Sequence, residues 1–279
     1  MIDRLIEKIK QTGNPSVIGL DTRPDFVPSG MSPLEFNCAV IDAVKDIVPA
    51  VKVQIACYEL YGIEGLKAFA GTLKYARESG LIVMTDAKRG DIGSTAENYS
   101  GAFLGQSTEF DSDFLTVNGY LGSDGVLPFV ADCKKFGKGI FVLVKTSNPS
   151  SAEIQDKVAD GLPVYGHMAQ LVSEWGKDLI GKYGYSSVGA VVGATYPEQA
   201  RRLREMFPSV FFLVPGYGAQ GGTAADAAVN FDANGLGAIV NSSRAILTAY
   251  RKDKYKGLTF AAAAREAAIE MRDDLRKHI

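Results

Sequence analysis

The 279-residue sequence is poor in cysteine and histidine. Its three cysteines, Cys38, Cys57 and Cys133, are widely spaced, and none stands in a Cys-x-x-Cys pair. This number and spacing argue against a disulfide framework and favour free, buried thiols in a reducing compartment. The two histidines, His167 and His278, lie in a predicted helix and next to the C-terminal residue. Neither position supports a histidine-based metal site or a Ser-His-Asp hydrolase.

An excess of charge of one sign and a long apolar run are also missing. The chain has 30 basic and 32 acidic residues and no block of like charges. A nucleic-acid-binding surface is therefore not expected, although a local basic pocket for one phosphate remains possible. No apolar run approaches the roughly 20 residues of a membrane span, and the N-terminus lacks the apolar core of a signal peptide. The sequence predicts a cytoplasmic protein that binds neither nucleic-acid polymers nor membranes.

Short apolar runs alternate with segments of helical period. The runs span residues 16–20, 50–56, 81–87, 114–118, 139–145, 187–193, 210–214 and 237–241. The helical segments include residues 32–47, 63–80, 95–105, 165–184, 197–207 and 259–279, and Gly80 and Gly184 resemble helix stops. Runs this apolar are typical of parallel strands covered on both faces. The pattern predicts an α/β fold, a (β/α)8 TIM barrel in a single domain over residues 1–279, with an open doubly wound sheet as the alternative.

The third apolar run leads into the most polar motif of the chain. In DAKRGD, Asp86, Lys88 and Asp91 follow a DxKxxD spacing. Residues two apart on a strand share a face, so Asp86 and Lys88 are expected to point the same way. A lysine between carboxylates stays charged and can donate a proton to a developing carbanion. Taken alone, the motif is also compatible with a surface salt-bridge cluster.

Three other runs carry polar residues near their ends. Lys52, within VPAVKVQIA, is costly to bury alone, so it either meets the DxKxxD charges at the barrel mouth or extends to solvent. Asp21, in GLDTRP, could bind a sugar hydroxyl or form a turn. Ser147 and Asn148, in KTSNPS, could bind a planar heterocycle or form a turn. Active sites of (β/α)8 barrels lie at the C-terminal strand ends, where these residues are predicted.

Phosphate-binding signals follow the seventh and eighth runs, the usual place for phosphate in this fold. The glycine-rich loop PGYGAQGGT at 215–223 allows its backbone to approach an anion closely, and Gln220 adds side-chain donors. Arg244, in NSSRAI, can donate two N–H groups to a phosphate. Ser243 could add a backbone N–H at the start of the next helix.

Taken together, from GLDTRP to NSSRAI, these motifs resemble the orotidine 5'-phosphate decarboxylase family, in particular its longer subgroup with DTRP. The most specific pieces are DAKRGDIGSTAENY and PGYGAQGG. The resemblance implies a carboxy-lyase that converts orotidine 5'-monophosphate (OMP) to UMP and CO₂, the last step of de novo pyrimidine nucleotide synthesis. It also implies that the reaction uses no metal and no organic cofactor.

The resemblance implies a role for each motif residue. Lys52, Asp86, Lys88 and Asp91 correspond to an alternating Lys-Asp-Lys-Asp catalytic network, in which Lys88 protonates C6 of the pyrimidine. The substrate-binding residues would be Asp21, Ile92, Thr95, Ser147, Asn148, Pro215, Gln220, Gly221, Ser243 and Arg244. A homodimer is also implied, in which Asp91 and Thr95 reach the neighbouring active site.

Two alternatives remain open. A metal-dependent sugar-phosphate decarboxylase or aldolase could share DxKxxD, but it needs carboxylates arranged for Mg²⁺, whereas here lysines accompany them. A catalytically silent nucleotide-binding barrel could share the phosphate site. Sensitivity of the activity to EDTA distinguishes the first alternative, and UMP binding without turnover would indicate the second.

Overall fold

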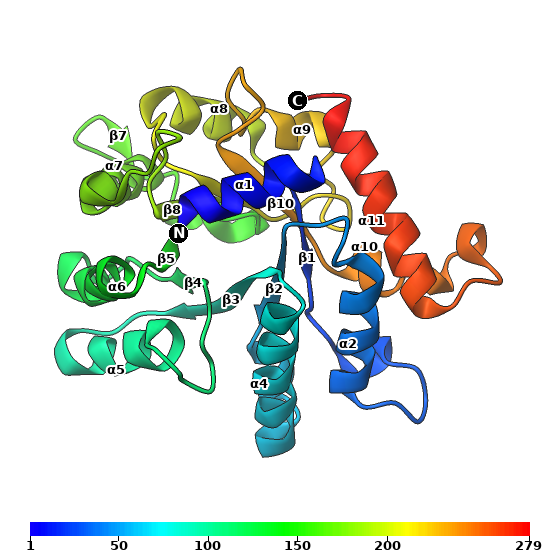
Figure 1. Ribbon diagram of the computed structural model, residues 1–279. Coiled ribbons are helices and arrows are strands. Elements are labelled where there is room, and N and C mark those ends of the chain that lie inside the picture. The colour runs from blue at the N-terminus through cyan, green and yellow to red at the C-terminus, as the bar shows by residue number, and fades with distance from the viewer.

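In the computed structural model, which describes residues 1–279, eight parallel strands close into a barrel (Figure 1). The strands are β1 (Ser16–Gly19), β2 (Ala50–Gln54), β3 (Ile82–Arg89), β4 (Phe114–Val117), β5 (Gly139–Lys145), β8 (Val188–Val192), β9 (Phe212–Val214) and β10 (Ala238–Ser242). Each pairs with the next of these along the chain, and β10 returns to β1, with Ser16 opposite Val240. The predicted single-domain (β/α)8 barrel is confirmed.

Helices surround the barrel (Figure 1). The longer ones are α1 (Ile2–Thr12), α2 (Pro33–Val44), α4 (Gly62–Glu78), α5 (Gly93–Leu104), α6 (Ser123–Phe136), α7 (Val164–Gly176), α8 (Pro197–Met206) and α11 (Phe260–Arg276). Shorter elements are α3 (Ala56–Glu59), α9 (Ala224–Ala228), α10 (Arg244–Leu247) and the antiparallel pair β6 (Val158–Ala159) and β7 (Leu162–Pro163). Local chemistry determines where α2 begins. Ser32 and Glu35 form a capping box there, and Pro33 lies in the first turn.

The apolar core has two layers. The larger cluster lies between the strands and the outer helices, and the smaller one fills the barrel near the strand starts. Helix α1 joins the smaller cluster through Ile2, Leu5 and Ile6, which pack with inward residues such as Phe114 and Phe141. The N-terminal end of the barrel is therefore closed by apolar packing, and the C-terminal end is left for polar residues.

Two glycines, Gly80 and Gly184, were expected to end helices. Gly80 follows α4 with φ 82°, as a helix stop should. Gly184 does not stop a helix, because α7 already ends at Gly176. Gly184 lies in a turn, in which its own N–H donates to the Gly181 carbonyl. Gly184, eight residues after the end of α7, therefore allows a tight turn before β8 and does not cap a helix.

The cysteines are free, but only Cys133 is buried, and Cys38 and Cys57 are half-buried. The expectation that all three thiols are buried is therefore wrong, because Cys38 lies on a partly covered helix face and Cys57 borders the cleft described below. No helix has the length and apolar character needed to span a membrane.

Candidate active site

A cleft of about 1120 Å³ opens at the C-terminal ends of the strands. Its volume lies just above the upper end of the range that is typical of small-molecule pockets. Among the residues predicted to form the site, those lining the cleft are Asp21, Lys52, Asp86, Lys88, Ser147, Asn148, Pro215, Gln220, Ser243 and Arg244. Motifs that lie up to 223 residues apart in the chain thus meet in one place, as the barrel geometry predicts.

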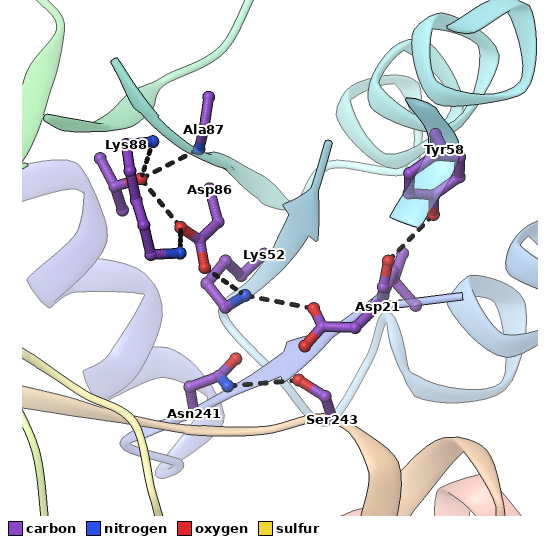
Figure 2. A network of polar contacts seen from close by, with 10 residues as sticks. Asp21, Lys52, Tyr58, Asp86, Ala87, Lys88, Asn241 and Ser243 are labelled. Carbon is purple, nitrogen blue, oxygen red and sulfur yellow. Dashed lines mark hydrogen bonds and ion pairs between the residues drawn. The ribbon is translucent and has the colours of Figure 1, made fainter. Parts of the chain in front are cut away.

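Four charged side chains form a chain of ion pairs in this cleft. Lys52 Nζ lies 3.2 Å from Asp21 Oδ1 and 2.9 Å from Asp86 Oδ2, and Lys88 Nζ lies 2.6 Å from Asp86 Oδ1. Figure 2 shows Lys52 between the two carboxylates, with Lys88 on the other side of Asp86. The Lys52 side chain is only 4% exposed, so it contacts the DxKxxD charges and does not extend to solvent. Pairing on both sides offsets the cost of burying this charge.

The same pairs determine the protonation of the two buried groups. Burial alone would raise the pKa of Asp86, but Lys52 and Lys88 outweigh it and hold the pKa well below its ordinary value of 3.8. Burial alone would lower the pKa of Lys52, but Asp21 and Asp86 raise it above its ordinary value of 10.5. Both groups therefore stay charged across the neutral range.

Lys88 reaches Asp86 from an irregular stretch of strand. Its φ is 49°, a left-handed conformation that is uncommon for a residue with a side chain, and the β3–β4 pairing shifts register between Thr85 and Arg89. Such a conformation costs on the order of 1–3 kcal/mol and needs support from its surroundings. The simple alternation of side chains along a strand does not hold at this point, although Lys88 and Asp86 still meet.

The support comes from Thr116 on β4, which is not one of the predicted site residues. Its Oγ1 accepts hydrogen bonds from the backbone N–H groups of Ala87 (3.0 Å) and Lys88 (2.9 Å) and donates one to Asp86 Oδ1 (2.9 Å). A threonine within an apolar run resembles any other β-branched strand residue. Only the register of β3 against β4 could have indicated that its hydroxyl faces the DxK turn.

The glycine-rich loop lies at the other side of the cleft. Arg244 Nη2 donates to the Ala219 carbonyl (2.9 Å), and Ser147 Oγ donates to Gln220 Oε1 (2.7 Å), so the loop contacts both α10 and the segment that follows β5. Gly216 has φ 100°, which a residue with a side chain rarely adopts. The guanidinium group and the amide of Gln220 both border the cleft and provide donors for an anion.

Ser243 lies beside this loop and close to β1. Its Oγ accepts a hydrogen bond from Asn241 Nδ2 (3.3 Å; Figure 2). A Cβ at Gly19 would lie 1.9 Å from the same Oγ, so only glycine allows β1 and this turn to approach each other.

Four predicted site residues do not line the cleft: Asp91, Ile92, Thr95 and Gly221. Asp91 Oδ1 accepts a hydrogen bond from the Ile92 N–H (2.8 Å), and Ile92 and Thr95 are exposed at the start of α5. Gly221 lies within the glycine-rich loop with φ 96°. Within one chain, Asp91 therefore does not join the ion-pair chain of Lys52, Asp86 and Lys88.

Comparison with known proteins agrees with this geometry. A family model described as "Orotidine 5'-phosphate decarboxylase / HUMPS family" matches residues 17–256. The chain belongs to this family. Membership was predicted from the motifs and is confirmed, as is the prediction of an enzyme of the carboxy-lyase type.

Relatives named orotidine 5'-phosphate decarboxylase match nearly the whole chain. One from Caldicellulosiruptor bescii is 45% identical over 273 residues, covering 89% of this chain and 90% of its own. One from Clostridium perfringens strain SM101 is 43% identical over 287 residues, covering 99% and 98%. Among solved structures, Leishmania donovani OMP decarboxylase has a TM-score of 0.76 and 26% identity, with coverage of 99% and 97%. Leishmania donovani UMP synthase has a TM-score of 0.78 and 29% identity, and this chain covers 56% of it.

Further residues of this family member border the cleft but were not among the predicted site residues. They are Arg23, Gln54, Thr146, Gln155, Tyr196 and Asn241. Gln155 and Tyr196 lie in loops that only the fold brings to the cleft, so sequence spacing contained no signal for them. No group of three or more His, Cys, Asp or Glu side chains is arranged to hold a metal ion.

Proposed function

We propose that this chain decarboxylates OMP to UMP and CO₂ without a cofactor, the last step of de novo pyrimidine nucleotide synthesis. The observation that carries the proposal is the Asp21-Lys52-Asp86-Lys88 chain, with Lys52 and Asp86 buried, which shares one cleft with the Gln220 and Arg244 donors. Membership in the family and relatives above 40% identity support the same reaction. A nucleotide fits the cleft because cationic and amide donors lie at one side and the charged chain at the other.

The substrate is placed by matching its groups to the side chains of the cleft. We infer that Gln220 and Arg244 bind the 5'-phosphate, assisted by Ser243 and by the loop containing Pro215 and Gly221. Asp21 and Lys52 would contact the ribose. Ser147 and Asn148 would face the pyrimidine. This arrangement directs C6 and its carboxylate toward Asp86 and Lys88.

The proposed chemistry uses charge already present in the site. The bond between C6 and the carboxylate carbon breaks, CO₂ leaves, and the electron pair remains on C6 as a carbanion without a conjugated acceptor. The Lys88 ammonium stabilises this charge and then transfers its proton to C6, which gives UMP and a neutral amine that solvent reprotonates. Asp86, kept ionised by two lysines, would repel the substrate carboxylate, and the repulsion ends when CO₂ departs.

The direct test follows the loss of ultraviolet absorbance of OMP with and without EDTA. Wild-type protein is expected to turn over OMP at the same rate in both conditions, because the proposed charges belong to lysines and not to a metal ion. Activity that EDTA abolishes would point to a metal-dependent enzyme of the same fold. A folded protein that binds UMP but does not consume OMP would instead be a silent nucleotide-binding barrel.

We further propose a homodimer with shared active sites. Asp91, Ile92 and Thr95 lie outside the cleft of their own chain, where a neighbouring chain can reach them. Large apolar side chains are exposed on the segments that follow β2, β3 and β4: Leu60, Ile63, Ile92, Tyr120, Leu121 and Leu127. In a homodimer that shares its sites at the start of α5, apolar side chains on these segments would be covered by the neighbouring chain.

Complementation tests the shared site. Lys88→Ala and Asp91→Ala chains are each expected to form inactive homodimers. A heterodimer isolated through two different tags holds one site with both residues intact, so it should show about half of the wild-type activity per dimer, as two-fold symmetry requires. The control pairs Lys88→Ala with the Lys88→Ala/Asp91→Ala double variant and should stay inactive. A purified heterodimer with no recovered activity would show that Asp91 does not act across the interface.

A further inference from the structure

Lys145, the last residue of β5, is a buried charge to which the proposed chemistry assigns no part. Its side chain is 0% exposed, and it does not border the cleft. Its Nζ lies 2.7 Å from Asp156 Oδ1 and 3.0 Å from Ser151 Oγ. The same ammonium lies 4.2 Å from the centre of the Tyr196 ring. A lysine is rarely buried without such partners, and these contacts fix the positions of Lys145 and its three partners relative to one another.

The partners of Lys145 belong to the two loops that form one wall of the cleft. Ser151 and Asp156 lie in the segment between β5 and α7, and Tyr196 lies between β8 and α8. The segment also carries Gln155 and Pro149, which border the cleft. Lys145 therefore joins both loops from behind the surface that faces a ligand.

These loops hold the short stretch Thr146–Asn148 from two sides. Gln155 Oε1 accepts from the Thr146 N–H (3.0 Å), and Gln155 Nε2 donates to Thr146 Oγ1 (2.7 Å). From the other loop, Thr195 Oγ1 donates to the Ser147 carbonyl (3.0 Å) and Tyr196 Oη donates to the Asn148 carbonyl (3.1 Å). The position of Ser147 thus depends on residues that Lys145 ties together.

We propose that Lys145 is a positioning residue for recognition of the nucleobase. Its ion pair with Asp156 and its contact with Tyr196 keep Thr146–Asn148 in the binding geometry before a ligand arrives. The inference rests on the proposed function, because that function places the pyrimidine against Ser147. Lys145 has no contact with Arg244 or with α10, and the bond from Ser147 to Gln220 is the side-chain link from this wall to the glycine-rich loop, so Arg244 does not depend on Lys145 directly.

The test compares ligands with and without a base. In Lys145→Met, a change that preserves most of the buried stem, the Kd for UMP is expected to rise roughly ten- to a hundredfold, because fewer molecules have the wall in the competent geometry. The Kd for ribose 5-phosphate should change less than about twofold, since Arg244, its main phosphate donor, is untouched. Both constants are measured by calorimetry on the full-length protein.

Lys138→Met is the matched control. Lys138 precedes β5 at the opposite end of the barrel and is also largely buried in an ion pair, 2.5 Å from Asp111 Oδ1. The Lys138→Met variant should change the melting temperature without a selective change in the Kd for UMP. Asp156→Asn should reproduce the selective loss of UMP affinity. In the Lys145→Met/Asp156→Asn double variant the two losses should not add, because both changes remove the same ion pair. Asp156 is partly exposed, so this variant keeps the test available if Lys145→Met does not fold.

Three outcomes of these binding measurements would contradict the inference. Equal UMP affinity in wild type, Lys145→Met and Asp156→Asn would overturn the inference. Parallel weakening of UMP and ribose 5-phosphate would also overturn it, since that pattern indicates a general structural role. A wild type that binds ribose 5-phosphate but not UMP would overturn the proposed function and, with it, the placement of the base.

Discussion

Lys88→Ala is expected to slow OMP decarboxylation by about four orders of magnitude or more, because one change removes both the proton donor and the nearest positive charge. The fold should survive. The Lys88 side chain is 46% exposed in the cleft, and Asp86 keeps its 2.9 Å contact with Lys52. The loss should therefore appear in kcat, with a smaller change in the Kd for UMP. Stopped and continuous ultraviolet assays together cover the required range of rates.

A matched control is Lys67→Ala. Lys67 is a solvent-exposed lysine on α4, paired with Glu64, and its removal should leave the kinetics unchanged. A Lys88→Ala protein that keeps more than about a tenth of the wild-type kcat would show that another group donates the proton, since loss of a general acid costs at least about a hundredfold. In that case the mechanism proposed for this site would be wrong.

Arg244→Ala is expected to lower kcat/KM for OMP by about three orders of magnitude, since charge-assisted contacts to a phosphate are worth several kcal/mol. Gln220→Ala should act in the same direction with a smaller effect. Both should reduce kcat as well as raise KM. Arg244 and Gln220 lie in or against the glycine-rich loop, so binding of a phosphate between them can close the loop and organise the distant site.

Orotidine, which lacks the phosphate, provides the control substrate for the same variants. Wild type and Arg244→Ala should process it equally slowly, because the missing group is the one that Arg244 would bind. Arg201→Ala, at an exposed position of α8, should match wild type on both substrates. Near-normal kinetics of Arg244→Ala and Gln220→Ala with OMP would contradict the assignment of the phosphate site.

Several elements could be predicted from the sequence because their cause is local. Parallel strands covered on both faces must be apolar throughout, which makes all eight runs visible and places their polar ends at one rim of the barrel. The pattern was less clear where local cues conflict. Helix α6 contains Gly125 and Pro128, which obscure its helical period, and the β6–β7 pair lies in a segment without apolar alternation and was not expected.

The sequence by itself therefore determined the fold class, the family and ten of the 28 residues that line the cleft, since motif spacing and strand ends are properties of neighbouring residues. Only the tertiary structure decided which partner each charge takes. Thr116 supports Lys88 from another strand, and Asp156 and Tyr196 hold Lys145 from two loops. It also showed that Asp91 lies outside the cleft of its own chain. The physical reason is that hydrogen bonds and ion pairs act over about 3 Å, and register and loop packing, not spacing along the chain, bring distant residues that close.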